Sequence, residues 1–540
     1  MKNFEEIVIP PLEAESFFID SSNINNVFYK TDNYENVLKP TTYFILGDKG
    51  SGKTMFSAYF SSKYSEEIVG KNFIISVDDY NKFLQMKKNN ELNYTDYTTI
   101  WKVILIIKIL LSIDKNEIDS IIKTPIFNKL KNITTVFNLA ETTKDTFSPS
   151  TIIDNKEFVE KLSNGFSNII SSTTLDVSSN INSSFSEKTG QSIEYKQLRY
   201  VDRWTSFIND ASEQLIDLRL KKPHYLFVDG IDIRPTSIDY SEYKECVSSL
   251  IRAVYDINYS IFSKMSHRDS GRLQIVVLSR LDIFLESGLN NTGCKIVDNS
   301  VYLNWALSNL NNVEETDIYQ LINNILSEGK TGVDMWQKYM NFDIERGHKL
   351  YNSFAYCMRL TAARPRDFVM ILKLLQEDVK NNKKNKNHKN KSLERIFYKD
   401  GFQKKYSTYY VQSIQSEMSF YYNKNEYDLF FSFIKTFNRL HFSYKEFMIK
   451  LDDFFQKEKL KRIFGNELEI LDLMYKLNII CFIEEKNIYR WKYRETTIDN
   501  YSPSLHDYKI DSNTKFVFHW AVEKALSIYT KSQNSYRGYY

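Results

Sequence analysis

The sequence predicts an α/β fold with a central parallel sheet, followed by a helical lid and a C-terminal winged-helix-like domain. Three observations lead to this prediction. In roughly the first 300 residues, short buried-strand patterns alternate with helical patterns, which is the order of parallel βαβ units. Beyond them the pattern turns helical. Near the C-terminus, a helical stretch at 467–477 precedes two strand-like stretches, which is the outline of a winged helix.

The composition argues against several classes of protein. With 540 residues, and at about 150 residues per domain, roughly two to four domains are expected. Gly (16) and Pro (9) are too scarce for a collagenous or Pro-rich disordered chain. The formal net charge is only +3, so any nucleic-acid surface must come from local clustering of basic residues. The four cysteines are far apart and form no CxxC pair, which argues against a disulfide scaffold or a zinc finger.

The chain is expected to be soluble and cytoplasmic, without a membrane partner. Glu5 and Glu6 stand where a signal peptide needs an apolar core. The most hydrophobic run, 100–113, is too short to span a bilayer and contains Lys102 and Lys108. This run therefore predicts a buried helix whose two lysines reach solvent through their apolar stems.

The elements of the predicted core follow one another along the first 305 residues. A Ser/Asn-rich stretch near 163–195 has the composition of a loop insertion, and strand patterns resume after it, so it interrupts the sheet without ending it. The predicted strands are 43–46, 72–77, 225–228 and 273–278. The predicted helices run from 54 to about 64, from about 92 to 111 and from 201 to 220.

The second half is divided into three predicted parts. A helical lid covers 306–379, a basic linker covers 380–406, and a helical, winged-helix-like domain covers 407–540. The run 380–391 contains Lys, Asn and His but no apolar residue, which favours a solvated loop, although contact with a phosphate backbone stays open. In the last domain, 478–483 and 488–493 are separated by a short polar turn and predict a β-hairpin.

The strongest functional signal is the octapeptide GDKGSGKT, which runs from Gly47 to Thr54. It satisfies the phosphate-loop pattern G-x-x-x-x-G-K-[ST] and lies between a predicted strand and a predicted helix. Its backbone N–H groups are expected to wrap phosphates, Lys53 to reach the β- and γ-phosphates, and Thr54 to offer a hydroxyl to Mg²⁺. The sequence therefore predicts ATP and Mg²⁺ as ligands. The nucleotide-binding residues in this loop are Gly47, Gly50, Ser51, Gly52, Lys53 and Thr54.

Acidic residues at the end of the strand 225–228 indicate a metal shell. Asp229 follows four apolar residues, and a carboxylate at that edge of a phosphate-binding sheet holds the shell of Mg²⁺. Gly230 comes next instead of a glutamate, so Asp232 is the candidate that positions the attacking water. The alternative for Asp232 is a helix cap or a turn residue.

Three arginines are candidates for sensing the nucleotide. Arg280 follows the strand 273–278 and could pair with phosphate bidentately, or else form a surface salt bridge with Asp282. Arg364 and Arg366 flank Pro365, which fits the first turn of a helix. Because the helix dipole disfavours a cation there, an anion must compensate, either the nucleotide or Asp367.

Taken together, these motifs resemble the STAND-type P-loop ATPases, a branch close to the AAA+ proteins. The DGID at 229–232 looks like the NACHT and KAP pattern, and Ser279-Arg280 is similar to the first sensor of that branch. The stretches 363–368 and 517–520 look like an uncharacterised bacterial family of predicted P-loop ATPases, described only by fold. The resemblance implies an ATPase core, a helical lid and a winged helix. It also implies that His519 lies near the nucleotide, although Trp520 replaces the aspartate that usually follows; the alternative is a core histidine.

The predicted function is a slowly hydrolysing ATPase that acts as a conformational switch. The resemblance implies a role in signalling or phage defence, with ATP and ADP as ligands and a protein effector as partner; self-association is left open. Two alternatives are a DNA-loading ATPase of the origin-recognition type that uses its winged helix, and a scaffold that binds nucleotide without hydrolysis.

Overall fold

The computed structural model describes residues 2–75, 80, 94–113, 117–118, 200–216, 218–306, 313–330, 332–346, 348–384, 393–485, 488–497 and 500–528. The predicted insertion near 163–195 lies outside these residues. The chain forms two compact units. Unit 2 comprises Asn36–Leu46 and Phe60–Val301. Unit 1 comprises Met1–Glu35, Gly47–Tyr59 and Tyr302–Tyr540, so the phosphate loop belongs to unit 1 and the strand before it to unit 2. The predicted boundaries at 305, 379 and 406 stay predictions.

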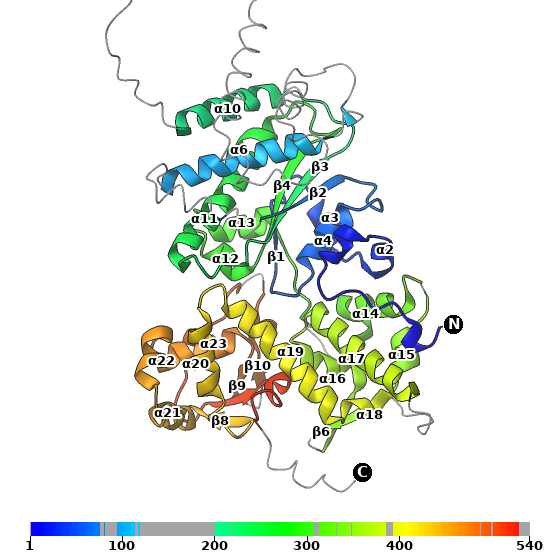
Figure 1. Ribbon diagram of the computed structural model, residues 1–540, viewed down its shortest axis with the longest axis vertical. Coiled ribbons are helices and arrows are strands. Elements are labelled where there is room, and N and C mark those ends of the chain that lie inside the picture. The colour runs from blue at the N-terminus through cyan, green and yellow to red at the C-terminus, as the bar shows by residue number, and fades with distance from the viewer. Residues whose placement is uncertain are drawn as a thin grey trace, which may run out of the picture. The chain divides into compact units, whose positions relative to one another are not determined.

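A parallel sheet of five strands forms the centre of the α/β core (Figure 1). Its order is β2-β3-β4-β1-β5, and β4 is buried along its whole length. Leu46 of β1 pairs with Ser279 of β4, and Ile74 of β2 pairs with Asp229 of β3. The strands are β1 (Phe44–Leu46), β2 (Val69–Ile74), β3 (His224–Asp229), β4 (Leu273–Ser279) and β5 (Ser300–Tyr302).

Helices that cover this sheet include the apolar run predicted to be buried. Helix α6 packs against α10, α11 and β3, and Trp101 within it is fully buried. Its two lysines, which were predicted to reach solvent, are half-buried: Lys102 pairs with Asp256 at 2.7 Å, and Lys108 lies 4.8 Å over the Phe73 ring. The helices after β2 are α6 (Tyr94–Ser112), α10 (Tyr200–Ile216), α11 (Tyr240–Asp256), α12 (Leu281–Leu285) and α13 (Thr292–Asn299).

Four predicted strands are present, with one shift. Strand β2 begins at Val69, three residues before the predicted start, and therefore includes Gly70. A glycine is required at this position of the strand, because a side chain there would clash with the carbonyl group of Phe60. Helix α4 (Lys53–Phe60) ends earlier than predicted, in a turn that leads to β2.

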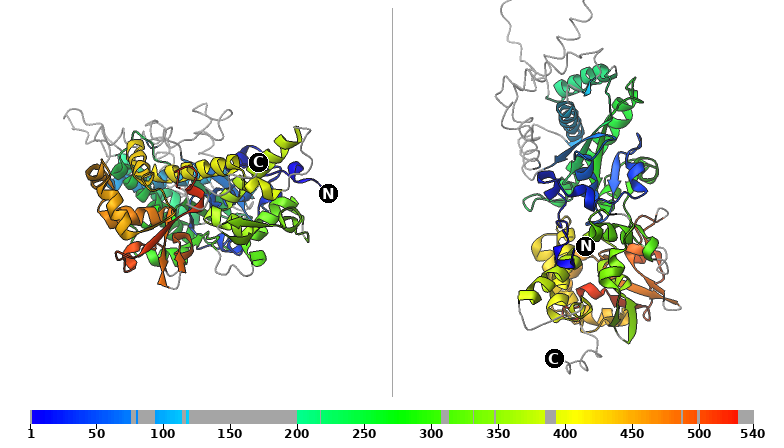
Figure 2. Two further views of the ribbon diagram at one scale, coloured as in Figure 1. Left: turned by 90° about the horizontal axis from the view of Figure 1, so that it is seen from below. Right: turned by 90° about the vertical axis from the view of Figure 1, so that its right-hand side faces the viewer.

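Unit 1 is mainly helical, as predicted for the second half of the chain (Figure 1). Helix α19 can be followed along its length, in yellow, in the left view of Figure 2. Near the N-terminus lie the short helices α1 (Ser16–Ile19), α2 (Ile24–Val27) and α3 (Asn33–Val37). The helices between residues 302 and 420 are α14 (Asp317–Ser327), α15 (Met335–Met340), α16 (Ser353–Thr361), α17 (Pro365–Lys384), α18 (Leu393–Phe397) and α19 (Asp400–Met418). The later helices are α20 (Lys424–Ile434), α21 (Tyr444–Asp452), α22 (Lys457–Phe464), α23 (Glu467–Lys476) and α24 (Lys492–Glu495).

Two small antiparallel sheets complete unit 1. Strands β6 (Asp343–Arg346) and β7 (Lys349–Asn352) form a hairpin. The predicted C-terminal hairpin is confirmed as β9 (Ile480–Glu484) and β10 (Ile488–Arg490). The hairpin belongs to a sheet of order β10-β9-β11-β8, in which β8 is His441–Ser443 and β11 is Lys515–Phe518.

The stretch predicted as a basic linker is helical on both sides of the undescribed residues 385–392. Its first residues end α17, and α18 and the start of α19 lie in 393–406. The loop predicted for 380–391 is therefore wrong for 380–384, which belong to α17, and the rest of that run lies outside the described residues. The prediction rested on the many basic residues and did not consider Phe397 and Phe402. Their rings lie 5.2 Å apart, and both are buried. Their burial fixes α18 and α19 against the helices around them.

Among the helices that the structure describes, none combines the length and the apolar composition that a bilayer crossing requires.

A buried asparagine side chain bonds to the backbone of β4 at a residue that lies before the part of β4 that pairs with β1. Asn258 donates to the carbonyl oxygen of Ile275 at 2.7 Å and accepts from the Ile275 N–H at 3.0 Å. It thus occupies the place of a neighbouring strand beside β4. We expect Asn258→Ala to leave both backbone groups of Ile275 unpaired, which destabilises unit 2 by at least about 2 kcal/mol.

Urea unfolding and amide exchange over β4 measure this effect. The exposed Asn290→Ala variant serves as the matched control, and equal stabilities of the two variants would contradict the assignment.

Candidate nucleotide-binding site

The topology of the sheet marks one place where a ligand is expected. From β1 the chain passes to β2 at one edge of the sheet, whereas from β4 it passes to β5 at the opposite edge. Because β1 and β4 are neighbours, the connections that follow them diverge. Ligands of open parallel sheets bind at such a switch point, beyond the carboxyl ends of the strands. The residues directly after the paired Leu46 and Ser279 are Gly47, which opens the phosphate loop, and Arg280.

The phosphate loop has the backbone shape that its glycines allow. Gly50 has φ of +88° and Gly52 has φ of +98°, both in the left-handed region that favours glycine. Ser51 N–H donates to the carbonyl oxygen of Asp48 at 3.1 Å, and α4 begins at Lys53. The first amides of a helix have no partner within the helix, so they can bind an anion.

Lys53 lies within the loop and not in solvent. Its side chain is buried, and its ammonium group donates to the carbonyl oxygens of Gly47 at 2.8 Å and Asp48 at 3.1 Å. The hydroxyl of Ser51 is also buried and finds no hydrogen-bond partner among the residues that the structure describes. A buried cation, an unpaired hydroxyl and a left-handed glycine backbone form a donor set that fits a polyphosphate. The hydroxyl of Thr54, at the start of α4, suits the Mg²⁺ that accompanies it.

The start of α17 lies directly against this loop. Arg366 N–H donates to the carbonyl oxygen of Gly50 at 3.3 Å, and a Cβ placed on Gly50 would lie 3.2 Å from that of Arg366. The structure thus brings Arg366 to the phosphate loop. Its guanidinium forms no ion pair or hydrogen bond within the described part of the chain, so it can meet an anion.

A strained turn sets the position of Arg364 and Arg366. Ala362 (φ +44°) and Ala363 (φ +57°) both adopt left-handed backbone between α16 and α17. Such residues cost about 1 kcal/mol each, so the surrounding structure must enforce this turn. Pro365 opens α17 as predicted.

The positive charge of Arg364 is balanced by an aspartate at the start of the same helix. Its Nε donates to Asp367 at 2.7 Å, and its guanidinium lies 5.1 Å over the Tyr410 ring. Burial alone would lower the pKa of Arg364, but the facing Asp367 carboxylate outweighs burial and raises it. Two anions were considered for this helix start, the nucleotide and Asp367. In the structure, Asp367 is the anion that pairs with Arg364.

His519 is a core histidine in this structure. Its ring stacks on Tyr410 at 4.9 Å and meets Trp491 edge-on at 5.0 Å. Its Nδ1 accepts the Ala521 N–H at 3.3 Å, while its Nε2 has no partner among the described residues. Burial, reinforced by the nearby charge of Arg364, lowers the pKa of His519 to about 3, so the ring is neutral. Tyr410 therefore joins Arg364 and His519 in one cluster.

In unit 2, Asp229 and Asp232 flank a glycine turn. Asp229 ends β3, and its Oδ1 accepts the Gly230 N–H at 2.8 Å. Gly230 has φ of +87°, and a Cβ there would lie 3.0 Å from the Ile75 carbonyl oxygen, so glycine is required. Asp232 lies half-buried in the turn that follows. Asp232 was considered as a helix cap or a turn residue. Because Asp239 is the residue that caps α11, Asp232 is a turn residue and not the cap of that helix.

Arg280 is held by a neighbouring acid. Its Nε donates to Asp282 at 3.0 Å, and a second guanidinium nitrogen pairs with the same carboxylate. The ion pair matches the alternative given for Arg280. The pair reaches from the interior to the surface, because the Arg280 side chain is 3% exposed and the Asp282 side chain 43%. Ser279 donates its hydroxyl to the Arg280 carbonyl oxygen at 2.9 Å.

Sequence reasoning missed three residues that contact the phosphate loop. Trp305 donates its indole N–H to the Ser51 carbonyl oxygen at 2.8 Å. Ser416 of α19 accepts from Lys49 at 2.6 Å. Lys492 of α24 pairs with Asp48 at 3.0 Å, although 444 residues separate them. A local pattern carries no signal for contacts over such separations.

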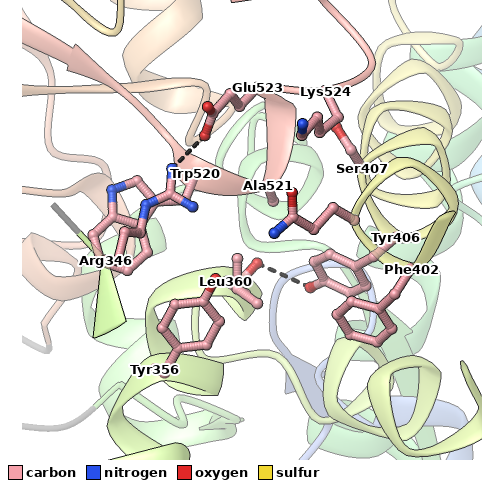
Figure 3. Close-up of a pocket in the computed structure, with 11 residues that line it drawn as sticks. Arg346, Tyr356, Leu360, Phe402, Tyr406, Ser407, Trp520, Ala521, Glu523 and Lys524 are labelled. Carbon is pink, nitrogen blue, oxygen red and sulfur yellow. Dashed lines mark hydrogen bonds and ion pairs between the residues drawn. The ribbon is translucent and has the colours of Figure 1, made fainter. Parts of the chain in front are cut away.

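A small cavity elsewhere in unit 1 is too small for a nucleotide (Figure 3). Its volume of about 20 Å³ suits one water molecule. Arg346 of β6 pairs there with the buried Glu523 and lies 4.4 Å over the Trp520 ring. Trp520 thus helps to attach the C-terminal segment to the β6–β7 hairpin.

Comparison with known proteins adds no family to this description. No family model matches the chain, and no curated protein and no solved structure matches it either. The structure itself has a five-strand parallel sheet with flanking helices, which is consistent with a Rossmann-like or P-loop α/β domain.

Burial of His519 predicts a pH dependence of stability. The pKa of His519 is about 3 in the folded chain, against 6.5 for an ordinary histidine. The free energy of unfolding that neutral His519 contributes is therefore fully present above pH 6.5. It is lost as the pH falls from 6.5 toward 3, because in that range only the unfolded chain takes up a proton on this ring. The loss is about 1.4 kcal/mol per pH unit.

Urea unfolding at pH 7 and pH 5 should show a smaller acid destabilisation for His519→Phe than for the wild type. Phe retains the stacking on Tyr410 but binds no proton. The exposed His506→Phe variant controls for loss of a histidine elsewhere, and identical pH slopes for His519→Phe and the wild type would show that burial does not control this titration.

Proposed function

We propose that this chain binds Mg·ATP at the phosphate loop and acts as an ATP-dependent conformational switch with slow hydrolysis. The observation that carries the proposal is the loop itself. Left-handed Gly50 and Gly52 shape it, and the Lys53 ammonium lies inside it. It also follows β1 directly at the switch point of the sheet, which is where a ligand is expected.

Each residue of the motif has a role in this proposal. Lys53 and the loop amides bind the phosphates, and Thr54 and Asp229 hold the Mg²⁺ shell. Bound Mg²⁺ supplies charge neutralisation between the β- and γ-phosphates. Asp232, half-buried after β3, positions the attacking water. Such catalysis consists of positioning and charge stabilisation, so a single acid with no neighbouring glutamate supports a slow rate.

Contacts of the loop with distant helices support a switch. The loop lies in unit 1, where Arg366, Trp305 and Ser416 contact it from three separate segments. A ligand shifts a conformational equilibrium only when it interacts differently with the two states. Phosphates that alter this loop would change its contacts with α17 and α19. The resemblance to STAND-type ATPases extends the proposal to signalling or phage defence with a protein effector.

The DNA-loading alternative gains no support from the helix before the C-terminal hairpin. That helix, α23, begins with Glu467 and Glu469 and carries Asp472 in its middle. Recognition helices present their N-terminal residues to the major groove, where carboxylates are repelled by phosphates. We therefore keep the switch as the proposed function.

Lys53 should be essential for nucleotide binding. Lys53→Ala removes the ammonium group inside the loop, so the affinity for Mg·ATP should fall at least about tenfold, or about 1.4 kcal/mol. Isothermal titration calorimetry measures the change, and Lys63→Ala, at an exposed lysine after α4, is the matched control. Unchanged ATP affinity in a folded Lys53→Ala protein would refute the site.

Arg366 should distinguish ATP from ADP. If its guanidinium closes on the γ-phosphate, Arg366→Ala weakens ATP binding more than ADP binding by about 1.5–3 kcal/mol, the free energy of a charge-assisted hydrogen bond. Titration of both nucleotides measures the difference, with the exposed Arg439→Ala as control.

Equal losses for ATP and ADP in the Arg366→Ala variant would assign Arg366 a structural role. An ATPase rate that depends on protein concentration, and that recovers when Arg366→Ala and Lys53→Ala proteins are mixed, would instead place the arginine across a subunit interface.

A further inference from the structure

An acidic side chain lies in the phosphate loop, and a lysine from the far end of the chain neutralises it. Asp48 is the second residue of the loop, and its carboxylate oxygens lie 3.1 Å and 3.0 Å from the Lys492 ammonium. The pair is largely withdrawn from solvent, with 27% of the Asp48 side chain and 14% of the Lys492 side chain exposed. Salt screens such a pair less than a fully exposed one.

The charge of Asp48 is unfavourable for the proposed ligand. Its backbone carbonyl oxygen accepts a hydrogen bond from the Lys53 ammonium, so the carboxylate is carried by a residue whose backbone contacts the cation that would meet the phosphates. A carboxylate there repels a polyphosphate, and a like charge at close range lowers affinity. An ammonium group 3.0 Å away cancels most of that repulsion.

Contacts that involve no carboxylate hold the loop independently of this pair. Trp305 bonds to the Ser51 carbonyl oxygen, and the Arg366 N–H bonds to that of Gly50. Lys49 bonds to Ser416 of α19. The Asp48–Lys492 pair is therefore one of several attachments, and among those named it is the one that includes a carboxylate.

We infer that Lys492 is a positioning residue of the nucleotide site, which screens Asp48 and so lets the loop accept a polyphosphate. This inference rests on the proposed function. Lys492 opens α24, directly after β10 and the capping residue Trp491. Displacement of α24 from the loop would expose the Asp48 charge and weaken nucleotide binding, so the C-terminal hairpin region regulates the affinity of the loop.

A double-mutant cycle on Mg·ATP affinity tests this inference. Lys492→Ala should weaken binding at least about fivefold, the lower end of typical coupling between sites. Asp48→Asn should leave binding unchanged or tighten it, because it removes the repelling charge. The double variant should bind like Asp48→Asn, and Lys492→Arg should bind like the wild type. The loss in Lys492→Ala should shrink as salt is raised.

The two single variants are expected to change the Mg·ATP affinity differently, and this difference separates screening of the Asp48 charge from simple attachment of the loop. If the pair only holds the loop in place, Lys492→Ala and Asp48→Asn weaken binding equally, and the inference is overturned. Lys461→Ala, which breaks a comparable pair with Glu467 in the same unit, is the control and should leave ATP affinity unchanged.

The wild-type measurement separates this inference from the proposed function. A wild-type chain that binds no Mg·ATP overturns both. A wild-type chain that binds Mg·ATP, together with a folded Lys492→Ala variant of equal affinity, overturns the screening role alone. Thermal unfolding of each variant establishes that it is folded, and Lys492→Gln replaces Lys492→Ala if the latter does not fold.

Discussion

The close approach of Gly50 to Arg366 is the constraint on which the phosphate loop and the helices around it depend. A side chain on Gly50 would have to share space with the Arg366 side chain, and the backbone there is left-handed at φ +88°. Only glycine satisfies both conditions without strain. The contact fixes the loop against the first turn of α17, and it places Arg366, whose guanidinium forms no ion pair within the described residues, beside the backbone of the loop. The strained turn at Ala362 and Ala363 is tolerated because it delivers the chain to this contact.

The arginines near the predicted site fall into two groups according to their partners. Arg280 and Arg364 are buried and each faces an aspartate, Asp282 and Asp367 respectively. A buried arginine that loses its carboxylate leaves an uncompensated charge, which is strongly unfavourable, so neither exchanges partners easily. Arg366 is half-buried and its guanidinium has no ion-pair partner in the described chain, so a phosphate can bind it without breaking an existing pair. This difference makes Arg366 the best suited of the three to sense a nucleotide.

The C-terminal region contributes attachment and charge to the phosphate loop and the helices around it. His519 and Arg364 both lie against the ring of Tyr410, and this cluster ties the end of the chain to α17 and α19. Neutral His519 suits this apolar setting, because a charged ring would be desolvated beside arginines. The charge that reaches the phosphate loop from this region comes from Lys492. The contact joins α24, which follows the C-terminal hairpin, to the phosphate loop.

The sequence by itself determined the features that depend on neighbouring residues. The GDKGSGKT loop between strand and helix, the apolar runs of β1, β3 and β4, the Pro365 helix start and the C-terminal hairpin all follow from local pattern, because turn geometry and strand burial are written in consecutive residues. The tertiary structure alone decided the strand order and the near-complete burial of the Arg280 side chain. It also decided the neutrality of His519 and the contact between Asp48 and Lys492. These depend on packing between segments up to 444 residues apart, and burial and charge pairing at such distances leave no periodic trace along the chain.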